Sequence, residues 1–204
     1  MRVVLLNGAP GSGKDSAGRA LLKGLYGTEI VKLAGALKAA THELFGLHGL
    51  APGGFEAVKG EPAPEFFGLT PREAYILVSE KMVKPVLGED FFGRVLVNRI
   101  RRLRNCRIAA VTDSGFVDEA RPVVEAFGPE NVLLARLHRP GHTFKGDSRS
   151  HIDLPDVASI DIVNDGDEAA FGTLVVHVVS QWASGNRFSA GTSMLHVSEV
   201  EKGL

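Results

Sequence analysis

Residues 8–14, GAPGSGK, have the residue types and the spacing of a loop that binds phosphate groups. Gly8, Gly13 and Lys14 match the pattern G-x-x-x-x-G-K. Glycines let the backbone turn so that successive N–H groups face one anion, and the Lys14 amine can reach the outer phosphates of a nucleotide. A glycine-rich turn with an ordinary surface lysine is the alternative, and the position between an apolar strand and a helix disfavours it. The residues expected to bind the nucleotide here are Gly8, Ala9, Gly11, Ser12, Gly13 and Lys14.

Asp15 stands where such a loop normally carries Ser or Thr, whose hydroxyl holds Mg²⁺. A carboxylate beside a triphosphate is repelled unless a cation or a substrate hydroxyl lies between them. Ser16 follows directly and can supply the missing hydroxyl. We therefore expect Asp15 and Ser16 to hold Mg²⁺ or to orient an acceptor. The alternative, that Asp15 only complements the positive end of the helix dipole, stays open.

Asp113 and the polar segment 138–151 are the other candidates for chemistry. Asp113 closes an apolar run at 107–113, and it could bind Mg²⁺ through water or accept the proton of an acceptor hydroxyl. Its alternative is a turn residue, because TDSG is also good turn chemistry. The segment HRPGHTFKGDSRSH suits a lid over a nucleotide, with Arg139, Lys145 or Arg149 reaching transition-state charge. A plain surface loop would have a similar sequence.

Five apolar runs and the helical patterns between them position these residues. The predicted strands are 2–7, 29–33, 107–113, 131–137 and 159–165, and the predicted helices cover 14–26, 36–47, 90–104 and 167–183. A further helix begins at Thr70, with Pro71 in its first turn and Glu73 completing a capping box. Alternating strands and helices predict an α/β fold with a parallel five-stranded sheet covered on both faces, in which ligands bind at the carboxyl ends of the strands.

Composition limits the class of protein. The chain has 204 residues, 44% of them hydrophobic, which suits one domain with a sizeable core. The formal net charge of −1 gives no general preference for nucleic acid or an anionic membrane. The single cysteine excludes an intrachain disulfide and fits a reducing cytoplasm. No apolar run is long enough to span a membrane and the N-terminus has no signal-peptide pattern, so we expect a cytoplasmic protein without membrane contact.

The segment SGKDS at 12–16 resembles the phosphate loop of bacteriophage deoxynucleoside monophosphate kinases. Further segments resemble that family in the same order along about residues 1–180: LAGALKAATHELFGL, LTPREAYILVSEKM, GEDFFGRVLVNRI, VTDSGFVDEA, LHRPG and DIVNDGDEAAF. Apart from the loop each segment is weak alone, and their shared order makes the resemblance persuasive.

This resemblance implies a three-layer P-loop NTPase fold of the nucleoside monophosphate kinase type, in which the γ-phosphoryl group of ATP moves to a deoxynucleotide with Mg²⁺. A single kinase domain would span 1–183, with a helical acceptor-side insertion at about 36–105, a lid at about 139–152, and a loosely held tail at 184–204. Lys14, Asp15, Asp113 and Arg139 would be catalytic, and Asp15, Ser16 and Asp113 would contact the metal. Lys38, Arg72 and Glu80 would bind the acceptor, and Asn164 would lie at the base of ATP.

Several positions depart from the family pattern. An arginine of the family is replaced by Gly115, and an asparagine by Asp118. Leu77, Val78 and Ser79 replace acceptor-side residues, and 148–152 reads SRSHI where HxSE is expected. The loss of an arginine weakens the case for an acceptor phosphate, because a planar guanidinium is the usual phosphate clamp.

These departures leave a second acceptor open. Related phage kinases phosphorylate the hydroxymethyl group of 5-hydroxymethyluracil in DNA, a step in thymine hypermodification. Asp15 or Asp113 could then be the base, and the DNA contact could use Arg99, Arg101, Arg102 and Arg104. The same arginines could simply form the solvated end of a helix. A nucleotide-binding protein without phosphotransfer is the rival from another class, and the sequence leaves the oligomeric state open, a homodimer included.

Overall fold

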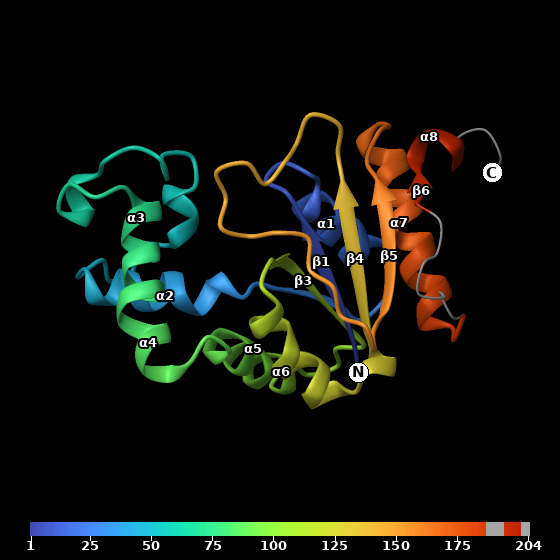
Figure 1. Cartoon of the computed structure of the whole chain (residues 1–204), viewed down its shortest axis with the longest axis horizontal. Helices are drawn as coiled ribbons and strands as arrows, with labels where there is room; N and C mark the ends of the chain where they lie inside the picture. Colours follow the sequence, from blue (N-terminus) through green and yellow to red (C-terminus); the bar gives the residue numbers. More distant parts are fainter. Residues whose placement is uncertain (187–193, 201–204) are drawn as a thin grey trace.

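A six-stranded, fully parallel sheet forms the centre of the computed structural model, which describes residues 1–186 and 194–200 (Figure 1). The strands lie in the order β2-β3-β1-β4-β5-β6, and each pairs with its neighbours in parallel. Their bounds are β1 Arg2–Gly8, β2 Thr28–Val31, β3 Ile108–Ser114, β4 Val132–His138, β5 Ala158–Val163 and β6 Leu195–His196. The prediction of an α/β fold with a parallel sheet is therefore confirmed.

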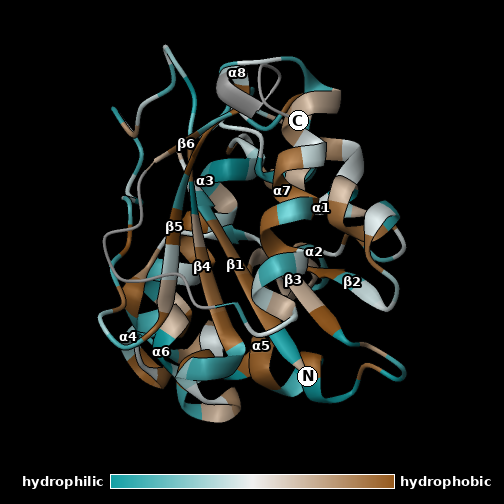
Figure 2. Cartoon of the chain, turned by 90° about the vertical axis from the view of Figure 1, so that its right-hand side faces the viewer, coloured by the Kyte–Doolittle hydropathy of each residue, from teal (hydrophilic) through white to brown (hydrophobic). Residues whose placement is uncertain are grey.

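Helices cover both faces of this sheet. One face packs against α1 (Lys14–Gly24), α7 (Glu168–Ala183) and α8 (Val197–Val200), and the other against α5 (Phe91–Arg101) and α6 (Val117–Phe127). Successive side chains of β1 point to opposite faces of the sheet. Val4 and Leu6 pack in the core on the side of α1 and α7, and Val3 and Leu5 pack in the core on the side of α5 and α6. Figure 2 shows the apolar strands lying between these helices. A strand buried on both faces reads as a continuous apolar run, which explains why these strands could be predicted.

The segment between β2 and α5 projects to one side of the sheet (Figure 1). It contains α2 (Ala34–Leu44), the short 3₁₀ helices Pro52–Phe55 and Pro64–Phe66, α3 (Pro71–Ile76), a π-helical stretch Leu77–Val83 and α4 (Lys84–Leu87). Its apolar side chains form a separate cluster around Phe66 and Ala74. The predicted capping box is present, because the Thr70 hydroxyl accepts from the Glu73 N–H and the Glu73 carboxylate accepts from the Thr70 N–H.

The sheet has one strand more than the five predicted. β6 is only two residues long and pairs with Ile162 and Val163 of β5, and so short a strand leaves no periodic signal. It lies in the segment 184–204, which the sequence predicts as a loosely held tail. Val197 is fully buried there, and the Asp165 carboxylate accepts hydrogen bonds from the Ser198 N–H and hydroxyl. The rest of that prediction, at 187–193 and 201–204, falls outside the described residues.

A short connection, η4 (Pro129–Asn131), leads from α6 into β4.

None of the helices described in residues 1–186 and 194–200 combines the length and the apolar character needed to cross a membrane.

Candidate active site

The loop between β1 and α1 has the backbone shape of an anion cradle. Gly11 and Gly13 adopt φ values of +77° and +104°, which side chains rarely tolerate. Both also lie where a Cβ would collide, Gly11 with the His142 ring and Gly13 with the Asn164 amide. These two glycines are therefore required by conformation and by close packing. The loop ends directly at the first residue of α1, so the positive end of that helix faces the same place.

The Lys14 amine lies folded over this loop. Its Nζ donates to the carbonyl oxygens of Gly8 and Ala9 at 2.6 and 2.8 Å. Burial, together with the nearby positive charge of Arg149, lowers the pKa of Lys14 to about 8. An anion bound in the loop would offset both effects, so the lysine is placed to gain from a phosphate.

Asp15 has a cationic partner that the sequence did not reveal. The Lys32 amine, just after β2, donates to the Asp15 carboxylate at 2.9 Å. Burial alone would raise the pKa of Asp15, but the hydrogen bond and charge of Lys32 outweigh it and hold this pKa below its ordinary value. The repulsion expected beside a triphosphate is thus reduced by a neighbouring ammonium. Ser16 lies on the same turn and accepts from the Arg19 guanidinium at 3.0 Å.

The Asp113 carboxylate faces the start of α2. Its two oxygens accept hydrogen bonds from the backbone N–H groups of Leu33 and Ala34 at 2.8 and 2.9 Å. Burial raises the pKa of Asp113, and these two N–H groups oppose the rise. A carboxylate of raised pKa at this edge of the sheet could accept a proton, and each oxygen keeps a further lone pair for that purpose. Whether Asp113 or Asp15 is the base remains a prediction.

Two buried asparagines hold the surroundings of the loop. The Asn164 amide donates to the Ser12 carbonyl at 3.1 Å, so the structure places it against the loop itself. Asn7, at the end of β1, donates to the carbonyls of Ser114 and Ser150 and accepts from the Ile152 N–H. Asn7 thus ties three segments together beside the loop. No local sequence pattern marks Asn7, because a polar residue at the end of a strand is common.

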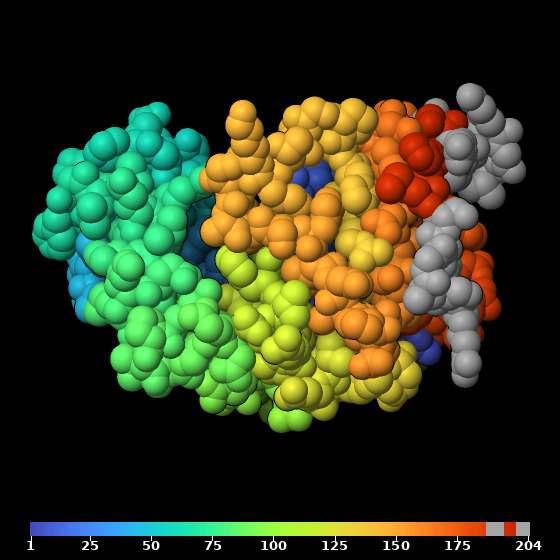
Figure 3. All heavy atoms as spheres, in the orientation of Figure 1, coloured from blue at the N-terminus to red at the C-terminus, as the bar shows by residue number. Residues whose placement is uncertain are grey.

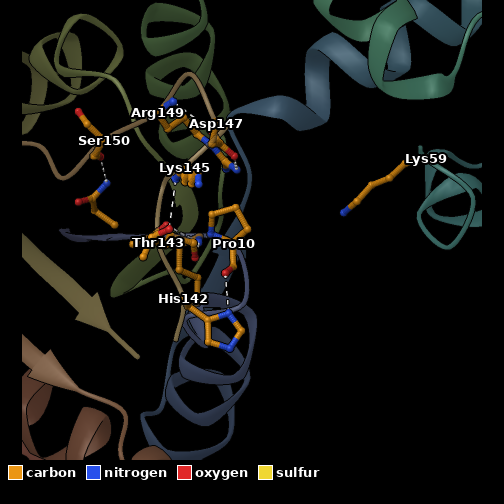
Figure 4. Close-up of polar contacts among 12 residues, drawn as sticks. Pro10, Lys59, His142, Thr143, Lys145, Asp147, Arg149 and Ser150 are labelled. Carbon is orange, nitrogen blue, oxygen red and sulfur yellow. Dashed lines mark hydrogen bonds and ion pairs between the residues drawn. The ribbon is translucent and has the colours of Figure 1, made fainter. Parts of the chain in front are cut away.

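The predicted lid, 139–152, lies across the phosphate loop (Figure 4). The Arg139 guanidinium donates to the Gly11 carbonyl at 3.2 Å. The His142 ring is 3.1 Å from the Pro10 carbonyl oxygen, through its Nδ1. Farther along, Lys145 donates its backbone N–H to the Thr143 hydroxyl. Arg139 is therefore brought to the loop, where its catalytic role stays a prediction.

The predicted acceptor residues Lys38, Arg72 and Glu80 lie on the insertion. Figure 3 shows a hollow between the green insertion and the orange 139–152 segment. The positive charge of Arg72 helps to lower the pKa of Asp147 on the lid. Lys38 forms an ion pair with Glu56 and stacks over the Tyr75 ring, while Glu80 accepts from the Lys84 amine at 2.9 Å. The structure therefore gives Lys38 and Glu80 partners within the insertion.

A buried charged cluster joins the insertion to the sheet domain. The Lys84 side chain is only 5% exposed and lies 3.6 Å from the Glu119 carboxylate of α6. Burial raises the pKa of Glu119 to about 7, opposed by Lys84 and reinforced by the charge of Asp113. Sequence reasoning missed both residues, because neither belongs to a local motif.

Three of the four basic residues predicted to contact DNA lie away from the phosphate loop. Arg101, Arg102 and Arg104 end α5 or precede β3, so they lie at the amino edge of the sheet, whereas the phosphate loop follows a carboxyl end. Arg99 differs, because it donates to the carbonyl of Lys32, whose side chain contacts Asp15. The four arginines therefore do not form one surface beside the loop.

No family model and no curated protein matches the chain. Among solved structures, an unliganded sugar kinase from Janibacter sp. HTCC2649 is similar, with 14% identity, a TM-score of 0.43 and coverage of 95% of this chain and 99% of that one. A shikimate kinase from Acinetobacter baumannii in complex with shikimate has 13% identity, a TM-score of 0.45 and coverage of 93% and 96%. The fold class therefore rests on the parallel sheet and its connections.

Proposed function

We propose that this protein is an ATP- and Mg²⁺-dependent phosphotransferase that moves the γ-phosphoryl group of ATP to a deoxynucleotide. The observation that carries the proposal is the position of the Lys14 amine and its glycine loop at the same sheet edge as Asp113 and the lid. A donor-phosphate cradle and a carboxylate that faces the insertion suit a transfer between two bound molecules.

The loop fits the phosphates of ATP. Its glycines leave no room for side chains, and the Ser12 hydroxyl is buried without a hydrogen-bond partner in the described residues. The Asp15 carboxylate and the Ser16 hydroxyl are the oxygen donors that would hold Mg²⁺, which neutralises phosphate charge when bound. Lys14 then exchanges the loop carbonyls for phosphate oxygens.

The acceptor would occupy the hollow between the insertion and the lid. In a deoxynucleoside monophosphate, an oxygen of the acceptor phosphate forms a bond to the γ-phosphorus while the bond from that phosphorus to the β–γ bridging oxygen breaks, leaving ADP; the attacking oxygen is already deprotonated at neutral pH. For a hydroxyl acceptor, the hydroxyl oxygen forms that bond and its proton passes to a carboxylate, for which Asp113 is our first choice because burial raises its pKa. Arg139, held beside Gly11, would stabilise the charge that develops on the transferred group.

A second acceptor is a hydroxymethyl group of 5-hydroxymethyluracil in DNA. The observation in its favour is a lysine on each side of the hollow: Lys59 on the insertion, where it pairs with Glu56 at 3.4 Å, and Lys145 on the lid (Figure 4). Lysines on two facing rims are suited to the phosphates of a strand lying between them.

Labelled ATP and Mg²⁺ should be incubated with the protein and either a panel of deoxynucleoside monophosphates or DNA that contains 5-hydroxymethyluracil. We expect label in a monophosphate. Label only in DNA would favour the second acceptor, and label in neither would contradict phosphotransfer and leave a nucleotide-binding protein. Lys14→Ala should abolish transfer, and Lys23→Ala, at the far end of the same helix, is the matched control.

A further inference from the structure

Arg149 is held in the lid by a neighbouring carboxylate. The Asp147 Oδ1 accepts from the Arg149 backbone N–H at 3.0 Å and from its Nε at 2.8 Å, and Oδ2 accepts from Nη2 at 2.7 Å. The Arg149 side chain is 27% exposed and that of Asp147 is 11% exposed. The hydrogen bonds from Arg149 lower the pKa of Asp147 to about 2, so the pair stays charged at neutral pH.

The stem of Arg149 crosses the sheet edge at Gly115. A Cβ on Gly115 would lie 2.5 Å from the Arg149 Cδ and 2.6 Å from its Cγ. The φ of Gly115 is not in the left-handed region, so its backbone shape alone does not require glycine. Glycine is required at this position because the Arg149 side chain approaches so closely. Gly115 therefore provides the space through which this guanidinium reaches the site.

The Arg149 side chain lies at the carboxyl edge of the sheet, against Gly115 and near the donor loop. Its charge lowers the pKa of Lys14, and the charges of Asp113 and Glu119, both in the sheet domain, raise the pKa of Arg149. Arg72, on the insertion, acts on its partner Asp147 across the hollow. Figure 4 shows Arg149 and Asp147 side by side on the lid, with Lys59 on the separate insertion.

One edge of the guanidinium remains for a ligand. Asp147 occupies the edge formed by Nε and Nη2, and Nη1 has no hydrogen-bond partner in 1–186 or 194–200. A guanidinium offers five N–H donors in a plane, so Nη1 and the second Nη2 hydrogen form a fork that matches two oxygens of one phosphate.

We propose that this edge of Arg149 binds a phosphate group already present on the acceptor, so that the enzyme selects phosphorylated acceptors. Asp147 positions the guanidinium, and Gly115 makes room for it. The proposal rests on the proposed function and names its acceptor class. The phosphate can belong to a free deoxynucleotide or to the backbone of DNA, and both present the same pair of oxygens.

Binding separates this proposal from catalysis. Calorimetry would measure the affinity of the protein, loaded with a non-hydrolysable ATP analogue and Mg²⁺, for four deoxynucleoside monophosphates and the four matching deoxynucleosides. A single-stranded oligonucleotide containing 5-hydroxymethyluracil forms the DNA arm. We expect the wild type to prefer a monophosphate, or the oligonucleotide, over every nucleoside.

Arg149→Ala should lower the affinity for the preferred phosphate ligand by about 10- to 100-fold and leave nucleoside affinity unchanged. Arg149→Lys should restore only part of the lost phosphate affinity, because an ammonium cannot donate two parallel hydrogen bonds to one phosphate. Gly115→Ala should copy Arg149→Ala by displacing the stem. The control is Arg121→Ala, which removes an exposed pair with Asp118.

The proposal is overturned if Arg149→Ala lowers nucleotide and nucleoside affinity equally, or changes neither. It is also overturned if the wild type binds no phosphate ligand more tightly than its nucleoside. Thermal melts identify any variant that fails to fold. If Arg149→Ala does not fold, the phosphate affinity of Arg149→Lys tests the proposal instead. Phosphate selectivity in a protein that transfers no label would refute the proposed function and leave the Arg149 site intact.

Discussion

The Asp113 carboxylate accepts a hydrogen bond from the Ala34 backbone N–H at 2.9 Å, and so links the end of β3 to the first turn of α2. A second bond, from the Leu33 N–H, uses the other oxygen. The same acid thus lies beside the donor loop and fixes the start of the insertion. This arrangement connects the place where the donor is expected to the place where the acceptor is expected.

Replacing Asp113 should therefore affect stability and transfer separately. Asp113→Ala leaves two N–H groups without their acceptor, which should cost about 1–3 kcal/mol in the free energy of unfolding. Asp113→Asn keeps one acceptor oxygen and should cost less, but should still lower the rate of transfer to a hydroxyl acceptor about 100-fold or more if Asp113 is the base. Urea unfolding and single-turnover transfer measure the two effects. Wild-type turnover in Asp113→Asn would show that another residue is the base. Asp118→Asn, at an exposed position, is the control.

ATP binding should draw a proton onto Lys14. The pKa of this lysine is about 8 in the unliganded protein, and bound phosphate should raise it, because the anion favours the charged amine. At about pH 8.5 binding should therefore be accompanied by net proton uptake. Calorimetry in buffers of different ionisation enthalpy measures the uptake. Lys14→Arg, which stays charged, should lose it; uptake that persists in that variant would point to another group.

Asp15→Asn distinguishes the two interpretations of that residue. If the carboxylate helps to hold Mg²⁺, the Mg²⁺ concentration for half-maximal transfer should rise about tenfold. ATP binding in EDTA should tighten at the same time, because one repulsive charge is gone. If the residue only complements the helix dipole, the Mg²⁺ requirement should not change, whereas the tighter binding in EDTA is expected under both interpretations. Glu168→Gln, an exposed carboxylate near Ser16, is the control for a general charge effect.

Glu119 should make the stability of the fold depend on pH. Its pKa is about 7 in the folded protein against 4.5 ordinarily, so the folded state keeps a proton that the unfolded chain releases between these values. The contribution of Glu119 to the free energy of unfolding is therefore largest below about pH 4.5, and falls as the pH rises to about 7. Glu119→Gln should flatten this decline in urea unfolding between pH 5 and 8. Glu125→Gln, exposed on the same helix, should retain it.

Local sequence patterns predicted what depends on local structure. The glycine loop and the capping box at Thr70 each lie within a few residues, so spacing alone reveals them. The strands buried on both faces stand out as apolar runs. β6 could not be predicted, because two residues are too few to show periodicity. Its position in the sheet is determined by its pairing with β5.

The pairs that complete the candidate site come from distant parts of the chain. Lys32 contacts Asp15 because β2 lies at the sheet edge beside α1. No local sequence pattern around either residue predicts this ion pair. Gly115 likewise has meaning only beside Arg149, from another loop. Read alone, Gly115 suggests a missing phosphate clamp, whereas the fold places a guanidinium over that position.

The insertion keeps its apolar cluster, around Phe66 and Ala74, apart from the two clusters that cover the sheet. A substitution inside it can alter the shape of the insertion without disturbing the residues that support the glycine loop. Under the proposed function, substitutions in this cluster could therefore change which acceptor is bound while the glycine loop stays constant. Leu37, Val83 and Lys84 belong to the same segment but contact the sheet domain, so they should stay unchanged in such a redesign.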